Sequence, residues 1–77
     1  MKNIEILGGG CAKCQQLQAN TEAAAQALGL EYHIVKVSDL REIAKRGVMS
    51  TPGLVVDGVV KSSGRLLTPD QIKPLLG

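Results

Sequence analysis

The amino-acid sequence predicts an α/β fold, with one mixed four-stranded sheet and helices on its faces. Three observations support this prediction. A long helical pattern lies between two short apolar runs, as in a βαβ unit. An Asp57-Gly58 pair between valine-rich runs is typical of a β-hairpin. A capped helical segment ends the sequence, so the expected order of elements is βαβ, then α, then ββα.

The first strand is expected over 4–7, where apolar residues run almost continuously, as in a strand covered on both faces. Glu5 interrupts this run and is interpreted as a strand-end charge that reaches solvent. The first helix is expected over 11–28, with Gly29 as its left-handed C-terminal stop. Its buried face is predicted by spacings of three and four residues and consists of Cys14, Leu17, Thr21, Ala24 and Leu28.

The second strand is expected over 30–37, and a short helix should follow it. Asp39 and Glu42, three residues apart, form a capping box that predicts the start of this helix. Gly47 is expected to end it. The buried side of this helix is predicted to consist of Leu40, Ile43 and Ala44.

The hairpin is expected to pair 54–56 with 59–60 through a two-residue type I′ turn, because Asp57 and Gly58 both tolerate positive φ. The last helix should begin at Thr68, with Pro69 at its first position and Gln71 completing a capping box. Pro74 removes an internal hydrogen bond, so this helix is expected to be short or kinked.

Composition limits the functional classes. The 77 residues are expected to form one domain, 1–77, whose core is aliphatic because there is no Phe and no Trp. The net charge is +2 and the basic residues are scattered, which argues against nucleic-acid binding. We find no signal-peptide pattern and no apolar run of membrane-spanning length. A cytoplasmic monomer that binds neither membrane nor nucleic acid is therefore expected.

Both cysteines lie in the stretch 8–14, Gly-Gly-Gly-Cys-Ala-Lys-Cys, where the first strand gives way to the first helix. In a cytosolic protein, a CxxC pair is more often catalytic or metal-binding than structural. Unpaired backbone N–H groups and the helix dipole at a helix start favour a Cys11 thiolate, and Lys13 adds positive charge. Cys14 falls on the apolar face and should be less exposed. We therefore predict that Cys11 attacks a substrate disulfide and that Cys14 resolves the intermediate.

Thr51-Pro52, just before the hairpin, supplies a second signal, because a proline is tolerated at the start of a strand. Together with the CxxC, these residues resemble the thioredoxin/glutaredoxin superfamily, in particular its small single-domain redox-active disulfide proteins of prokaryotes. The resemblance covers essentially the whole chain. It implies a thioredoxin-like (glutaredoxin-like) fold, a cis-proline that faces the CxxC, and a thiol-disulfide oxidoreductase with no cofactor beyond the Cys11-Cys14 disulfide.

The resemblance also implies how substrates bind. The backbone of Thr51 would pair with an extended substrate segment, and Ser63-Gly64 resembles the turn that helps glutaredoxins hold glutathione. The implied partners are protein disulfides, together with a thioredoxin-reductase-like enzyme or glutathione as electron donor. The expected substrate-binding residues are Gly10, Ala12, Lys13, Thr51, Pro52, Ser63 and Gly64.

Two alternatives remain open at this point. A metal chaperone-like module could bind Cu(I) or Zn(II) through the CxxC, since thiolates select soft ions. Such modules follow the order βαββαβ and carry Met where this chain has Gly9. No metal ligand is assigned, and His33 is interpreted as a partly exposed strand residue. The other alternative is an adaptor whose CxxC is vestigial or senses oxidation.

Three cations, Lys13, Lys61 and Arg65, could border the predicted site. We interpret them first as charge that keeps the surface soluble. The alternative interpretation is a basic rim that favours acidic partners or the carboxylates of glutathione.

Overall fold

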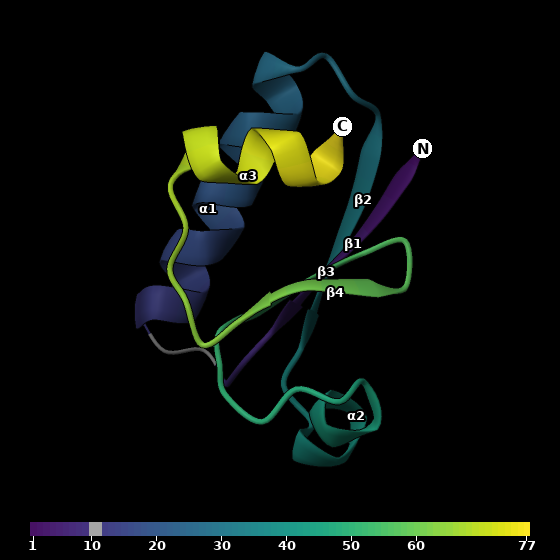
Figure 1. Cartoon of the computed structure of the whole chain (residues 1–77), viewed down its shortest axis with the longest axis vertical. Helices are drawn as coiled ribbons and strands as arrows, with labels where there is room; N and C mark the ends of the chain where they lie inside the picture. Colours follow the sequence, from purple (N-terminus) through teal and green to yellow (C-terminus); the bar gives the residue numbers. More distant parts are fainter. Residues whose placement is uncertain (10–11) are drawn as a thin grey trace.

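The structure, a computed structural model, describes residues 1–9 and 12–77. Its elements are β1 (Lys2–Leu7), α1 (Ala12–Ala27), β2 (Tyr32–Val37), α2 (Leu40–Lys45), β3 (Gly53–Val56), β4 (Val59–Ser63) and α3 (Pro69–Leu76) (Figure 1). The predicted order βαβ-α-ββα is confirmed. Because α2 separates β2 from β3 and α3 follows β4, this order differs from the βαββαβ order of metal chaperone-like modules.

The four strands form one mixed sheet in the order β2-β1-β3-β4. β1 and β2 are parallel, whereas β1 pairs with β3, and β3 with β4, in antiparallel fashion. Leu7, the last residue of β1, pairs with Val37 on one side and with Gly53 on the other. The C-terminal ends of β1 and β2 and the start of β3 therefore lie next to one another at the same end of the sheet.

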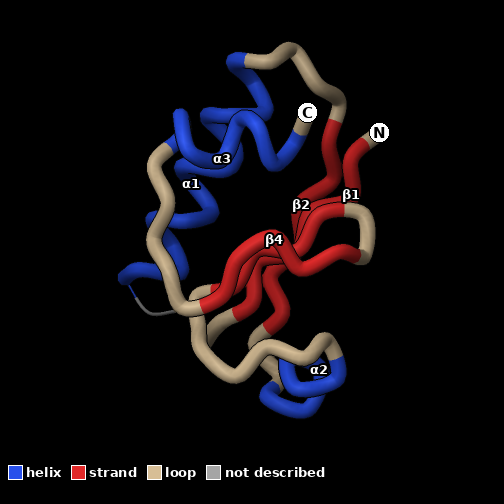
Figure 2. The backbone as a smooth tube through the Cα atoms, in the orientation of Figure 1, coloured by secondary structure: helices blue, strands red, loops and turns tan. Residues whose placement is uncertain are grey.

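Two apolar clusters cover the two faces of the sheet. On one face, α1 and α3 pack over Ile4 and Ile6, and Figure 2 shows these two helices on the same side of the strands. On the other face, Leu7 packs with Ile43 of α2 and with Val48. Since successive residues of a strand point to opposite faces, β1 contributes to both clusters. The expectation that β1 is covered on both faces is confirmed.

Three predicted buried positions, Leu28, Leu40 and Ala44, are wrong. Leu28 is 42% exposed, and Ala25 is buried in its place. The reason is that α1 ends at Ala27, so Leu28 lies beyond the last helical residue. In α2, only Ile43 is buried; Leu40 is 78% exposed and Ala44 is also exposed. A helix of six residues presents little more than one side chain to the sheet.

The interpretation of Glu5 as a strand-end charge is wrong, because Glu5 lies within β1, although its side chain keeps 27% of its surface exposed. Glu5 is partly buried and accepts two hydrogen bonds from the Arg46 guanidinium, at 2.7 and 2.8 Å. The hydrogen bond from Arg46 holds the pKa of Glu5 below its ordinary value. Glu42 pairs with Lys45 at 3.0 Å, while Asp39 alone caps α2 by accepting the Arg41 N–H. The bidentate contact between Arg46 and Glu5 ties the end of α2 to the middle of β1.

The predicted turns and the caps of α1 and α3 are confirmed, whereas the predicted Asp39–Glu42 capping box is reduced to the Asp39 cap. Gly29 has φ +67° after α1, and Asp57 and Gly58 have φ +50° and +80° in the hairpin. At the start of α3, Thr68 and Gln71 form the reciprocal capping box. Pro74 lies inside α3, which is short at eight residues. Among the described residues, no helix has the length and apolar character needed to cross a membrane.

Candidate functional site

The first turn of α1 presents its residues to different surroundings. Cys14 is 4% exposed, whereas Ala12 and Lys13 are exposed. Cys14 is followed at helical spacing by the buried residues Leu17 and Thr21, as the sequence pattern predicts. The Cys14 sulfur therefore belongs to the interior side of the helix, one turn from its start.

Gly8 determines what packs beside this sulfur. Its N–H donates to the carbonyl of Val37 at 2.9 Å, which fixes the backbone just past β1. A Cβ atom added to Gly8 would overlap Cys14 Sγ and would lie 3.7 Å from Thr51 Cβ. Because Gly8 has no side chain, Cys14 of α1 and Thr51 of the loop before β3 can both lie close to its Cα. In the sequence, Gly8 is only one of three consecutive glycines, and no local signal distinguishes it as the one that contacts Cys14.

The segment 50–53 forms the opposite wall. The Thr51–Pro52 peptide bond is cis, as the family resemblance implies. Pro52 is buried and Thr51 is exposed. Val48, which precedes this segment, packs in the apolar cluster that contains Leu7 and Ile43. Thr51 therefore lies at the surface directly beside the buried sulfur of Cys14.

The Ser63-Gly64 turn adjoins this wall. The N–H of Gly64 donates to the carbonyl of Pro52 at 2.8 Å, and Ser63 pairs with Gly53 at the end of the β3–β4 ladder. Gly64 has φ +71°, and an added Cβ would lie 2.8 Å from the Cβ of Ser50. Both backbone conformation and space therefore require glycine here.

Most of the predicted site residues thus come together. Gly10 and Cys11, expected to contact and to attack the substrate, lie outside the described residues. Lys61 lies within β4, two residues before Ser63, and His33 is exposed at the start of β2. Among the described residues, no group of three His, Cys, Asp or Glu side chains could hold a metal ion.

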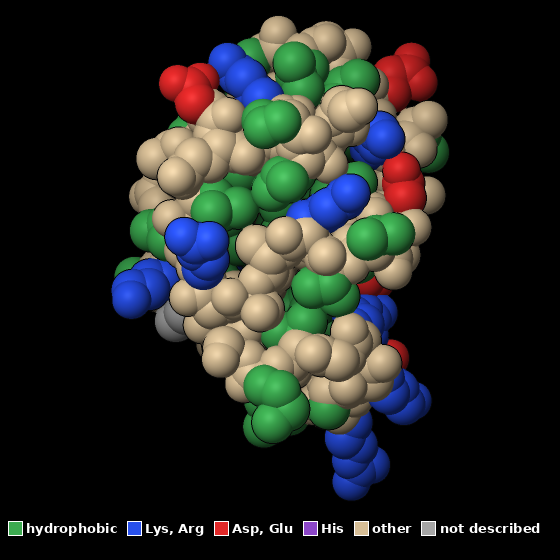
Figure 3. Space-filling model, viewed as in Figure 1, with side chains coloured by type: hydrophobic (Ala, Val, Ile, Leu, Met, Phe, Trp, Pro, Cys, Tyr) green, Lys and Arg blue, Asp and Glu red, His purple; other side chains and the backbone are tan. Residues whose placement is uncertain are grey.

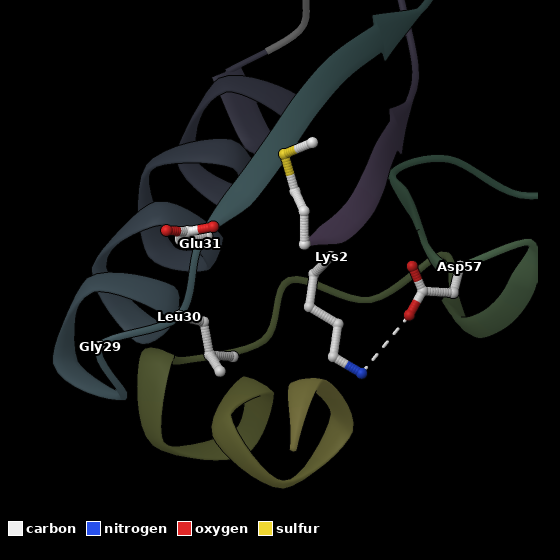
Figure 4. A pocket seen from close by; sticks show the side chains of 6 residues that line it. Lys2, Gly29, Leu30, Glu31 and Asp57 are labelled. Carbon is white, nitrogen blue, oxygen red and sulfur yellow. Dashed lines mark ion pairs between the residues drawn. The ribbon is translucent and has the colours of Figure 1, made fainter.

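A separate hollow of about 450 Å³ lies at the other end of the sheet and contains none of the predicted site residues. It is lined by the start of β1, the turn after α1 and the hairpin turn (Figure 4). Lys2 and Asp57 form an ion pair there, with 3.4 Å between Nζ and Oδ2. The hollow therefore plays no part in the site around Cys14.

Comparison with known proteins connects this arrangement to a family. The family described as "Thioredoxin domain" matches residues 2–77. The chain belongs to the thioredoxin family. It is 38% identical over 76 residues to a thioredoxin of Methanothermobacter thermautotrophicus, and the match covers 99% of both chains. It is 41% identical over 70 residues to a thioredoxin of Methanocaldococcus jannaschii, covering 91% of this chain and 80% of the relative.

A solved structure supports the thioredoxin-like topology. The structure titled "Structure of a malarial protein" superimposes with a TM-score of 0.72 and covers 97% of this chain and 92% of the other. The two sequences are 12% identical, so this likeness concerns the fold alone. The predicted fold class and family resemblance are both confirmed.

Proposed function

We propose that this thioredoxin-family protein is a thiol-disulfide oxidoreductase that reduces or exchanges protein disulfides through Cys11 and Cys14. The observation that carries the proposal is the packing of the Cys14 sulfur. It is nearly inaccessible to solvent, yet it lies beside the surface residue Thr51 because Gly8 has no side chain. The names of the two archaeal relatives support the same activity class.

The burial of Cys14 supports the proposed division of roles. Cys14 as a whole is 4% exposed, which disfavours direct attack by its sulfur on a disulfide of another protein and supports Cys11 as the attacking thiol. The Cys11 thiolate attacks one sulfur of the substrate disulfide, breaks that bond and releases the first substrate thiolate. The Cys14 thiolate then attacks Cys11 Sγ in the mixed disulfide and releases the second. Two electrons pass to the substrate, the two thiol protons neutralise the released thiolates, and Cys11 and Cys14 become a disulfide.

The substrate contacts are proposed from the geometry around Thr51. An extended segment would pair with the Thr51 backbone, since Thr51 is exposed while Pro52 is buried. The turn at Ser63-Gly64, held by the Gly64–Pro52 hydrogen bond, would border that segment on one side. Ala12 and Lys13, together with Gly10, would border it on the other. A thioredoxin-reductase-like enzyme or glutathione would return the two electrons to the Cys11–Cys14 disulfide.

The decisive test is Cys14→Ser. This variant keeps the attacking thiol but lacks the resolving one, so it should accumulate a mixed disulfide between Cys11 and an oxidised protein such as insulin. Mass spectrometry of the intact adduct and of its peptides would assign the bond to Cys11. Cys11→Ser is the matched control. It should form the adduct much more slowly than Cys14→Ser, because its remaining cysteine, Cys14, is buried.

The same pair of variants can refute the proposal. Equal adduct formation through Cys14 would contradict the assigned roles. A wild-type protein that reduces neither insulin nor glutathione disulfide, but binds Cu(I) tightly through both thiols, would favour the metal-chaperone alternative.

A further inference from the structure

The charged side chains are distributed unevenly between the two ends of the molecule. We define the site end as segments 5–9, 12–16, 36–53 and 62–66, which include Cys14 and Pro52. It holds three acidic and six basic side chains, so its formal net charge is +3, whereas the remaining residues hold three basic and four acidic side chains. On the face shown in Figure 3, the large red side chains lie in the upper half together with several blue ones, whereas the side chains that extend from the lower edge are blue. The basic residues of the site end are Lys13, Lys36, Arg41, Lys45, Arg46 and Arg65.

Ion pairing decides which of these cations have a carboxylate partner. At the site end, Glu5 and Glu42 are already engaged by Arg46 and Lys45, at 2.7 and 3.0 Å. Within the described part of the chain, the four remaining cations of the site end have no carboxylate partner: Lys13, Lys36, Arg41 and Arg65.

The opposite end behaves differently. Two of its three basic residues, Lys2 and Lys73, are paired with Asp57 and Asp70, at 3.4 and 3.3 Å. Figure 4 shows the Lys2–Asp57 pair. Among the described residues, Lys61 has no carboxylate partner. Among the described residues, four of the five basic side chains without a carboxylate partner therefore lie at the site end.

Two of these unpaired cations flank the site directly. Lys13 is the neighbour of Cys14 in the first turn of α1. Arg65 follows Gly64, whose N–H bonds to the carbonyl of Pro52. Both residues are exposed, and they come from different parts of the chain, α1 and the segment after β4. Met49, two residues before Thr51, is 94% exposed and offers a flexible apolar contact.

We propose that the preferred substrates of this site are acidic protein segments, with Asp or Glu side chains on both sides of the reactive disulfide. This inference rests on the proposed function and deepens it. Carboxylates flanking the disulfide would reach Lys13 and Arg65 while the segment lies along Thr51. Lys36 and Arg41 would attract the acidic surface of the same partner during encounter, because complementary charge raises association rates. Because the unpaired cations are spread over α1, β2, α2 and the segment after β4, they suit an extended protein surface better than a small dicarboxylate.

The test uses three synthetic peptides with the same disulfide, flanked by Asp, Ser or Lys. The second-order rate constant for reduction by the pre-reduced wild-type protein is measured for each and divided by the rate constant with dithiothreitol, which corrects for intrinsic reactivity. Two exposed charge pairs predict that the Asp-flanked peptide reacts about three- to tenfold faster than the Lys-flanked one at about 0.1 M salt. The preference should nearly disappear at about 1 M salt.

Matched variants locate the effect. Lys13→Gln and Arg65→Gln each remove one positive charge and should each lower the Asp-over-Lys preference by about two- to threefold. Ala23→Glu changes the net charge by the same amount at an exposed position of α1. It lies ten residues, about 15 Å, beyond Lys13, farther than the screening length of about 10 Å. This variant should keep the preference.

Each contrary result has its own meaning. Equal corrected rates for the three peptides would overturn the inference and leave the proposed function in place. If no peptide were reduced at all, the proposed function would fail, and the inference with it. If glutathione disulfide were reduced as fast as the Asp-flanked peptide, with the same loss in Lys13→Gln and Arg65→Gln, small carboxylate thiols and not acidic protein segments would be the favoured substrates.

Discussion

Replacing Gly8 by alanine is the most informative single perturbation of the site. The added Cβ would overlap Cys14 Sγ and would lie 3.2 Å from Cys14 Cβ. The backbone at Gly8 is held by its hydrogen bond to Val37, and Cys14 is fixed by the packing of α1 on the sheet. The overlap therefore cannot be relieved by moving one free end, and either the helix start or the Cys14 side chain must shift.

Inserting one methyl group into a closely packed interior typically costs about 1–3 kcal/mol. The direct overlap at Cys14 Sγ places Gly8→Ala in this range, and we expect the free energy of unfolding to fall by about 2 kcal/mol. For a domain of this size, that loss lowers the melting temperature by about 8–16 °C. Displacement of the sulfur should also slow the proposed resolution of the mixed disulfide, by about tenfold or more.

Urea unfolding in excess reductant measures the stability of the dithiol form, and Gly9→Ala supplies the matched control. No atom lies within 4 Å of a Cβ added to Gly9, and Gly9 is exposed. Gly9→Ala should therefore change the stability by less than about 1 kcal/mol, in either direction. Equal losses in the two variants would show that the backbone of the glycine stretch, and not the contact with Cys14, is what alanine disturbs.

A double-mutant cycle tests the contact itself. In a Cys14→Ala background the Sγ atom is absent, so the cost of Gly8→Ala should fall by about 1 kcal/mol or more. A smaller cost should persist, because the contact with the Cβ of residue 14 remains and because L residues rarely adopt the φ of +157° at Gly8. If the two substitutions were additive, the Cys14 sulfur would not be what requires glycine at position 8.

Two further predictions concern residues around this site. Glu5→Gln weakens the bidentate contact with Arg46 and should cost about 1–2 kcal/mol at neutral pH. Because the pKa of Glu5 is lowered in the folded protein, the ionised side chain stabilises the fold above about pH 4.5, and this stabilisation is lost as the pH falls through the folded pKa. Between about pH 6 and 3, the free energy of unfolding should therefore fall less steeply with decreasing pH in the variant than in the wild type. Identical slopes would contradict this. Gly64→Ala should cost about 1–3 kcal/mol in urea unfolding, because φ is +71° and the new Cβ meets Ser50. Gly58→Ala, with φ +80° and open space, is the control and should cost only about 1 kcal/mol; equal losses would mean that the Ser50 contact is unimportant.

The sequence by itself determined the elements and their order. Caps and turns depend on a few neighbouring residues, which is why Asp57-Gly58, the Thr68–Gln71 capping box and the Gly29 stop were predicted correctly. Cys14 was placed on the buried side of α1 for the same reason, since helical spacing is a local property.

Only the tertiary structure decided what surrounds these elements. Glu5 finds Arg46 across 41 positions of sequence, and Gly8, Cys14 and Thr51 meet because the strand order brings the end of β1 beside the start of β3. The same packing decided which lysines are neutralised by acids and which remain unpaired around the site. Contacts of this kind depend on how distant segments share one sheet, and no local pattern in the chain encodes that pairing.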